Sequence, residues 1–149
     1  MGTNNSDTED SKHEGKLAID VLESILDSIP TTGLPMPNRM GMDAAIVRVD
    51  SEKIFCFSKV EFGLGEKGAA DDIISEMENR ASEFGKIIVI DPVVLFPPGS
   101  SIEIIKRVVS EVAEAARNHG IIVGKGHTET TSKVKATTLI ATVLGSVNK

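Results

Sequence analysis

The chain has 149 residues, the length of one ordinary domain, which can bury a hydrophobic core without disulfides or metal ions. Hydrophobic residues make up 40% of it and aromatic residues only 3%, which predicts a core of aliphatic side chains. The formal net charge of −6 argues against a general nucleic-acid binder, because such proteins usually present a basic face. The polar N-terminus and the lack of a long apolar run also argue against a secretory signal and a membrane span.

Cysteine usage points to a reducing compartment. Cys56 is the single cysteine, so no disulfide can form within the chain. We therefore expect a cytoplasmic protein with neither a membrane nor a nucleic acid as partner. Cys56 lies between Phe55 and Phe57 in a predicted strand, and we interpret it as a small core residue.

The N-terminal 14 residues differ in composition from the rest. Residues 1–14 contain no aliphatic side chain after Met1, so they cannot offset the entropy lost on ordering. We predict a disordered tail over 1–14, with His13 as solvated sequence, and a single domain over 15–149.

Hydrophobic periodicity predicts the first half of this domain. Apolar residues at helical spacing indicate a helix over 16–29 that Pro30 stops, followed by a loop rich in Gly and Pro. Residues 44–49 and 53–60 are typical of two strands joined by a short polar hairpin. After a glycine-containing loop, a second helix is expected, with Asp71 or Asp72 as its N-cap and Gly85 at its end.

The second half follows the same logic. Residues 86–96 form a nearly continuous aliphatic run, typical of a strand covered on both faces, and Asp91 within it needs a partner or marks a sheet edge. Ser100 and Glu103 indicate a capping box at the start of a helix that runs to His119. We then predict a short strand over 121–123, a polar loop over 124–132 and a strand over 134–144. This order predicts an α+β fold, with a mainly antiparallel sheet and its helices on one face.

Four short motifs occur in a consistent order along the chain. They are the segments Gly41–Val47, Ala70–Ile73, Phe96–Ser101 and Gly126–Glu129. They resemble, in this order, the Gly-x-Asp-Ala-Ala, Ala-Asn-Asp-Ile, Pro-Pro-Gly and Gly-Gly-His-Thr-Glu motifs of the N-terminal domain of the AIR synthase superfamily. That superfamily includes aminoimidazole ribonucleotide synthetase, thiamine monophosphate kinase and the hydrogenase maturation dehydratase. The resemblance spans roughly residues 15–146, so we expect a stand-alone N-terminal domain without the family's C-terminal domain.

The resemblance implies a fold, a ligand and an assembly. The fold is ferredoxin-like, and its sheet pairs with that of a second copy into a barrel, which implies a homodimer. ATP would lie at the junction, with Mg²⁺ held by Asp43 and Asp72, since carboxylates approach a triphosphate only through a hard cation. Local structure alone also favours Asp72 as a helix N-cap, so both interpretations of Asp72 remain open.

The proposed nucleotide-binding residues are Lys59, Lys125, Gly126, His127 and Thr128. Two of them depart from the family pattern, because Lys59 replaces an aspartate and Lys125 replaces the first glycine of a pair. Lys59 is either a solvated lysine or a cation that contacts phosphate directly. His127 is either a proton shuttle or phosphate donor, or a residue that ties its turn together with Thr128 and Glu129.

Two functions therefore remain open at the level of sequence. The chain is a nucleotide-binding domain that acts as a homodimer or with a separately encoded C-terminal-domain protein, or it is a non-catalytic dimerisation or scaffold module. No Ser/His/Asp triad and no zinc spacing can be argued from the sequence. We expect no independent catalysis, because the second wall of the family's active site is absent.

Overall fold

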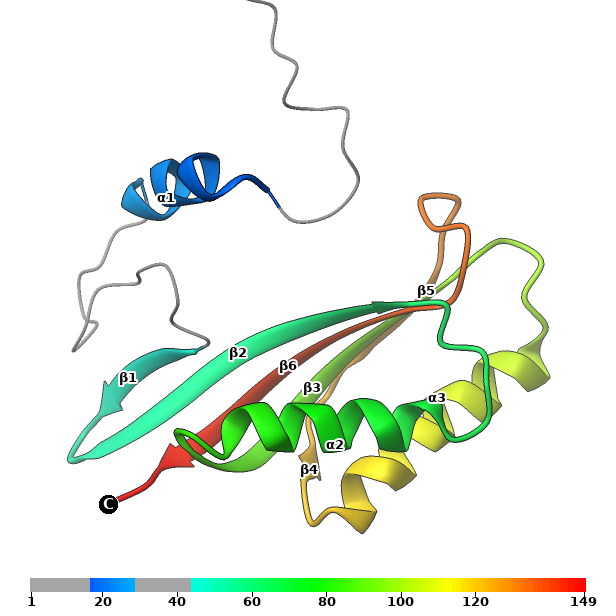
Figure 1. Ribbon diagram of the computed structural model, residues 1–149. Helices are drawn as coiled ribbons and strands as arrows, with labels where there is room; N and C mark the ends of the chain where they lie inside the picture. The colour runs from blue at the N-terminus through cyan, green and yellow to red at the C-terminus, as the bar shows by residue number, and fades with distance from the viewer. Residues whose placement is uncertain (1–16, 29–43) are drawn as a thin grey trace, which may run out of the picture.

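The computed structural model describes residues 17–28 and 44–149 (Figure 1). The predicted tail over 1–14 and the predicted metal ligand Asp43 lie outside these ranges. Within them, no helix is long and apolar enough to cross a membrane.

A mixed sheet of six strands forms the centre of the fold. Its strands are β1 (Ala45–Val49), β2 (Glu52–Phe62), β3 (Gly85–Phe96), β4 (Ile122–Val123), β5 (His127–Thr130) and β6 (Thr138–Val147). The main order is β1-β2-β6-β3-β4, and β5 pairs with β3 on the same edge as β4, farther along the strand. The pairs β1–β2, β2–β6 and β6–β3 are antiparallel, whereas β4 and β5 run parallel to β3. The α+β class is confirmed.

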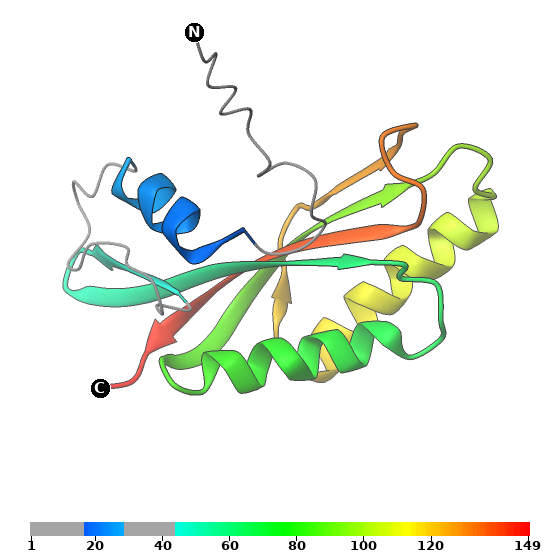
Figure 2. The ribbon, with the colours of Figure 1, turned by 45° about the horizontal axis from the view of Figure 1, so that its top comes forward.

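Two helices cover one face of this sheet. Figures 1 and 2 show α2 (Ala69–Ala81) and α3 (Ile102–Asn118) side by side on the same side of the strands. The core lies between them and the sheet, with Ile74 and Met77 of α2 against strand residues such as Ile90 and Val143. It is mainly aliphatic as predicted, although Phe55 and Phe96 are among its largest fully buried side chains.

The first helix does not take part in this core. Helix α1 (Ile19–Asp27) lies on the other side of the sheet from α2 and α3, and none of its residues is buried (Figures 1 and 2). The expectation that the helices cover one face therefore holds for α2 and α3 and not for α1.

The opposite face of the sheet, here called the open face, is also apolar. Side chains alternate along a strand, so the residues between the core positions point away from α2 and α3. Most of them are only half-buried, and Val60 is 48% exposed. The open face is defined by the aligned side chains of Val47, Ile54, Cys56, Val60, Val89, Val93, Ile140 and Leu144.

Cys56 belongs to this open face, so its interpretation as a core residue was wrong. It pairs with Leu144 in β6 and Ala45 in β1, and it is half-buried. Its neighbours Phe55 and Phe57 point into the core instead, as the period of two along a strand requires.

The predicted polar loop over 124–132 is partly a strand, which is the main correction to the topology. Residues 127–130 form β5, with all four residues exposed. The polar residues of β5 show no hydrophobic alternation, so the sequence pattern does not predict a strand there. The strand lies at a sheet edge and forms through its backbone pairing with β3. The last strand begins at Thr138 and ends at Val147, three residues later at its C-terminal end than predicted.

Both helix N-caps also differ from the prediction. Helix α2 begins after Gly68, whose φ of +89° is left-handed, so neither Asp71 nor Asp72 is its N-cap. Helix α3 is capped by Ser101, whose hydroxyl accepts the amide of Ile104 at 3.2 Å. The Ser100 hydroxyl, which was predicted to cap the helix, instead donates to the carbonyl of Pro97 at 2.7 Å in the turn before the helix.

Candidate functional site

The loop between β4 and β5 carries two of the predicted nucleotide-binding residues, Lys125 and Gly126. Gly126 has a left-handed φ of +64°, and a Cβ added there would lie 2.6 Å from the carbonyl oxygen of Pro92. Only glycine fits this position without strain. The amide of Gly126 donates to the Asp91 carboxylate at 2.8 Å, while Lys125 is exposed.

His127 and Thr128 follow this loop on β5. His127 pairs with Val93 and so lies on the same side as the open face, whereas Thr128 pairs with Val94 and lies on the other side. The imidazole Nε2 of His127 is 3.0 Å from the Glu129 carboxylate. This is the contact expected if His127 ties its turn together. The His127 side chain is 59% exposed, which also leaves it accessible to a ligand.

Lys59 lies on β2 and points toward α2. Its ammonium donates to the Glu76 carboxylate at 2.8 Å and lies 3.6 Å from that of Glu61. The hydrogen bond to Glu76, supported by the charges of both carboxylates, raises the pKa of Lys59 despite partial burial. The positive charge is therefore already compensated within the chain, and neither predicted role of Lys59 describes this arrangement fully.

The sheet separates Lys59 from residues 124–128, the predicted phosphate loop. Lys59 is in register with Ala141 of β6, which pairs with Pro92 of β3, and Pro92 contacts Gly126 beyond it. With strands about 4.8 Å apart, these three steps separate the Cα atoms of Lys59 and Gly126 by about 14 Å. Lys59 and His127 also point to opposite faces, so the described residues of one chain do not bring them together.

The predicted metal ligands are only partly described. Asp72 lies in the first turn of α2 and is exposed, and Asp43 is outside the described ranges. Among residues 17–28 and 44–149, no group of three or more His, Cys, Asp or Glu side chains is arranged to hold a metal ion. A magnesium ion at Asp72 would therefore need further ligands, such as Asp43 or phosphate oxygens, which suits an ion that commonly uses one or two carboxylates plus phosphates.

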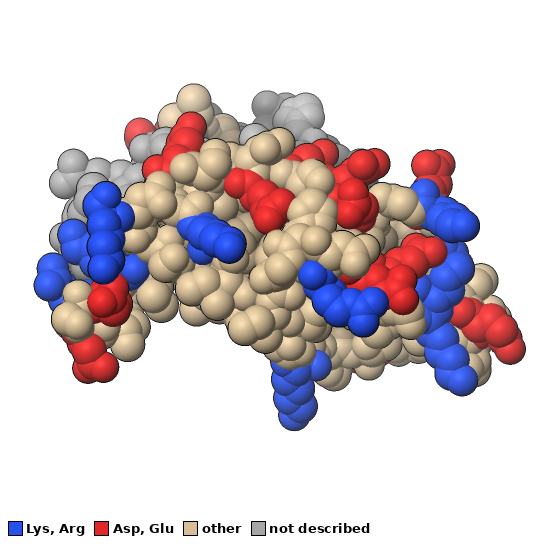
Figure 3. Space-filling view, turned by 90° about the horizontal axis from the view of Figure 1, so that it is seen from below, with Lys and Arg blue, Asp and Glu red and all other residues tan. Residues whose placement is uncertain are grey.

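Two surface hollows lie beside the helices, away from Lys59 and the 125–128 loop. The larger, of about 440 Å³, lies between α3 and β4, and the smaller, of about 220 Å³, lies between α2 and α3 and includes Lys67 and Asp71. On the helix-covered side of the molecule, basic and acidic side chains are interspersed (Figure 3). Neither hollow contains the predicted nucleotide-binding residues.

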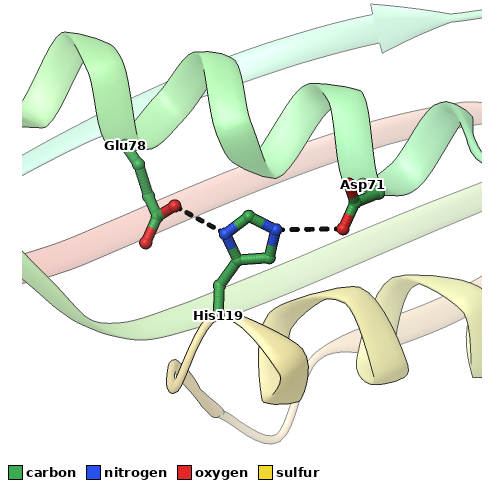
Figure 4. A network of polar contacts seen from close by, with 3 residues as sticks. All are labelled: Asp71, Glu78 and His119. Atoms are coloured by element: carbon green, nitrogen blue, oxygen red, sulfur yellow. Dashed lines mark hydrogen bonds and ion pairs between the residues drawn. The ribbon is translucent and has the colours of Figure 1, made fainter.

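His119 joins helices α2 and α3 through two hydrogen bonds, although the sequence predicted it only as the end of a helix. Figure 4 shows the imidazole of His119, at the end of α3, between two carboxylates of α2. Its Nδ1 lies 2.6 Å from Glu78 and its Nε2 lies 2.9 Å from Asp71. Asp71 and Glu78 are seven residues apart, which places them on the same face of a helix, and this spacing was the available signal.

Both contacts favour the charged imidazole. The hydrogen bond to Glu78 first, and that to Asp71 second, raise the pKa of His119 above its ordinary value. The stabilisation by His119 is therefore complete below the pKa of an unfolded-state histidine, about 6.5, and is lost as the pH rises through the raised folded-state value.

We expect His119→Gln to reduce stability more at mildly acidic pH than at alkaline pH. At pH 5.5 the variant should lose about 0.5–1 kcal/mol of unfolding free energy, a modest amount because the contacting carboxylates are partly solvated. At pH 9 the difference from wild type should be smaller, because the imidazole loses its charge. Urea unfolding at both pH values measures the two differences, and a difference that grows with pH would contradict the assignment.

No protein-family profile and no curated protein sequence matches the chain, but solved structures do. A ThiL structure complexed with AMPPCP and TMP superposes with a TM-score of 0.62 at 16% identity, covering 85% of this chain. The HypE–HypF complex gives 0.63 at 17% identity over 87% of this chain. PurLQS from Thermotoga maritima gives 0.61 at 15% identity over 78% of this chain.

These likenesses concern the fold and only part of each matched protein. The chain spans 40% of the ThiL chain, 42% of the matched chain in the HypE–HypF complex and 21% of the matched chain in PurLQS. At such low identity, the shared property is the arrangement of the sheet and helices. The chain therefore shares its fold with part of each of these proteins.

Proposed function

We propose that the chain is an AIR synthase-like domain that forms a homodimer through its open face and binds a magnesium nucleotide without catalysing a reaction alone. The observation that carries the proposal is the apolar character of the open face. Helices α2 and α3 cover only one side of the sheet, yet Val, Ile and Leu side chains line the other. Burying such a face against a second copy is favourable and protects it from non-specific association.

The polar groups within the open face are compatible with a dimer interface. Ser58 and Thr142 face each other across β2 and β6, and their hydroxyls lie 2.9 Å apart. Asp91 follows in the same row on β3 and accepts the Gly126 amide. The paired hydroxyls can be buried at little cost, whereas the exposed, charged Asp91 carboxylate must stay in contact with water at the rim of the interface.

Nucleotide binding is supported by the fold and by the phosphate loop. The ThiL structure with the same fold is a complex with AMPPCP, a nucleotide analogue. In this chain the proposed contacts are Lys59, Lys125, Gly126, His127 and Thr128, with Mg²⁺ bound by Asp43 and Asp72. Because Lys59 points to the helix-covered face, a second copy at the open face could complete the site only around residues 125–127, and Lys59 would take part only if a separately encoded C-terminal-domain protein extended the site to that face.

A scaffold module is the second candidate. The observation in its favour is the ion pairing of Lys59, whose ammonium is already bound by Glu76 and lies near Glu61. A phosphate must displace these carboxylates before it can use Lys59, which lowers its affinity. In this alternative the dimer forms, and the phosphate loop has no ligand.

Sedimentation and cysteine reactivity test the homodimer in the intact protein. We expect a concentration-dependent dimer, and Cys56 on the open face should be alkylated more slowly in the dimer than in the monomer. A monomer at high micromolar concentration, with unchanged Cys56 reactivity, would refute the dimer.

Amide chemical-shift mapping with Mg-ATP tests nucleotide binding. We expect shifts at residues 124–130, together with an affinity that Lys125→Met lowers by about tenfold, because a lysine–phosphate bond contributes about 1.5 kcal/mol. The matched control is Lys133→Met, an exposed lysine in the following turn, which should change the affinity little. Saturating Mg-ATP without shifts in this loop would leave the scaffold module.

Turnover is measured separately. We expect no phosphate release above that of an Asp43→Ala variant, because the described residues of one chain do not bring Lys59 and residues 125–128 together in an enclosed site. Clear release above this control would show that the chain is an enzyme by itself.

A further inference from the structure

Strand β3 carries two short strands end to end along its outer edge. Residues Val89 and Ile90 pair with β4, and the segment Val93–Phe96 pairs with β5. The break between β4 and β5 lies opposite Asp91 and Pro92. Pro92 has no N–H group, so it cannot donate a hydrogen bond to a neighbouring strand there.

The Asp91 side chain instead accepts a backbone amide across this break. Its Oδ1 accepts the Gly126 amide at 2.8 Å, and the Gly124 amide donates to the carbonyl of Ile90 at 2.7 Å. A Cβ added at Gly124 would lie 2.9 Å from the same Asp91 oxygen. The path of the chain through the break is thus set by one carboxylate and by glycines that let the backbone approach it.

We propose that Asp91 is the positioning residue of the 124–128 phosphate loop, a role that rests on the function proposed above. By holding the Gly126 amide, Asp91 sets the register in which β5 begins, and therefore the faces to which His127 and Thr128 point. The same bond has a consequence for recognition. The Gly126 amide is occupied, so within the proposed contact set Gly126 shapes the loop rather than donating to phosphate, and the side-chain donors are the Lys125 ammonium, the His127 imidazole and the Thr128 hydroxyl.

Hydrogen exchange of the Gly126 amide in the intact chain tests the positioning role without any ligand. In Asp91→Ala this amide should exchange about tenfold faster than in wild type, because an amide–carboxylate bond is lost. In Asp91→Asn the side-chain oxygen can still accept the amide, so exchange should stay within about threefold of wild type. The Phe57 amide in the β2–β6 region reports any general loss of stability, and Glu83→Ala, an exposed carboxylate in the turn before β3, is the matched control.

Mg-ATP affinity provides the second measurement. We expect Asp91→Ala to weaken binding by about tenfold and Asp91→Asn to bind within threefold of wild type. Unchanged Gly126 exchange in Asp91→Ala, or equal acceleration in both variants, would overturn the proposal. If wild type binds no Mg-ATP, the proposed nucleotide function fails, while the exchange comparison still decides whether Asp91 positions the loop.

Discussion

Replacing Gly145 by alanine is expected to lower the free energy of unfolding by about 3 kcal/mol or to prevent folding, the range of severe overpacking. Gly145 is buried in β6, between β2 and β3. A Cβ there would overlap the carbonyl oxygen of Lys86 and the ring of Phe55. The backbone oxygen cannot move without disturbing the β3–β6 pairing, so the clash has no inexpensive relief.

Urea unfolding measures this loss, with Gly65→Ala as the matched control. The nearest atom to a Cβ at Gly65 is the Gly63 carbonyl oxygen at 3.9 Å, an ordinary contact, so this variant should change stability by less than about 1 kcal/mol. Adding Phe55→Leu to Gly145→Ala should not restore wild-type unfolding free energy, because the clash with the Lys86 carbonyl oxygen remains. Wild-type stability in Gly145→Ala would contradict the packing described for β6.

Placing a charge in the open face should abolish the proposed homodimer. Leu144 lies between Cys56 of β2 and Val89 of β3 on that face. Leu144→Arg would bury an unpaired guanidinium between the two copies, which costs several kcal/mol, so we expect the dimer to weaken at least about 100-fold. In the monomer the arginine can reach water, so the fold should remain.

Sedimentation equilibrium measures the dimer affinity, and alkylation of Cys56 reports whether the open face is covered. The matched control is Ile104→Arg, the same charge on a partly exposed residue of α3, which should leave the dimer affinity unchanged. A Leu144→Arg variant that is folded and dimerises as wild type would place the interface elsewhere.

Much of the fold could be predicted from the sequence, because its elements follow strong local rules. Helical spacing of Ile73, Met77 and Ala81 predicted α2, and the aliphatic run over 86–96 predicted β3. The short polar turn at Asp50 predicted the hairpin of β1 and β2. The residues that carry each signal lie close together in the sequence, so the spacing of hydrophobic and polar residues is sufficient to detect it.

Other features depend on contacts between distant segments. Strand β5 is polar and was predicted as a loop, since only its pairing with β3 makes it a strand. The same holds for the partners of charged residues, because Lys59 meets Glu76 and His119 meets Glu78 only after α2 packs on the sheet and on α3. Asp91 was recognised as a carboxylate that needs a partner, but the partner, the Gly126 amide, is 35 residues away.

The sequence by itself determined the α+β class and the aliphatic core, and it pointed to residues 125–128 as candidate ligand contacts. The tertiary structure decided which side of the sheet each side chain faces, and with it the separation of Lys59 from His127. The physical reason is that the period of two along a strand sets only an alternation of faces. The register between strands, together with the position of α2 and α3, determines which of the two faces becomes the core.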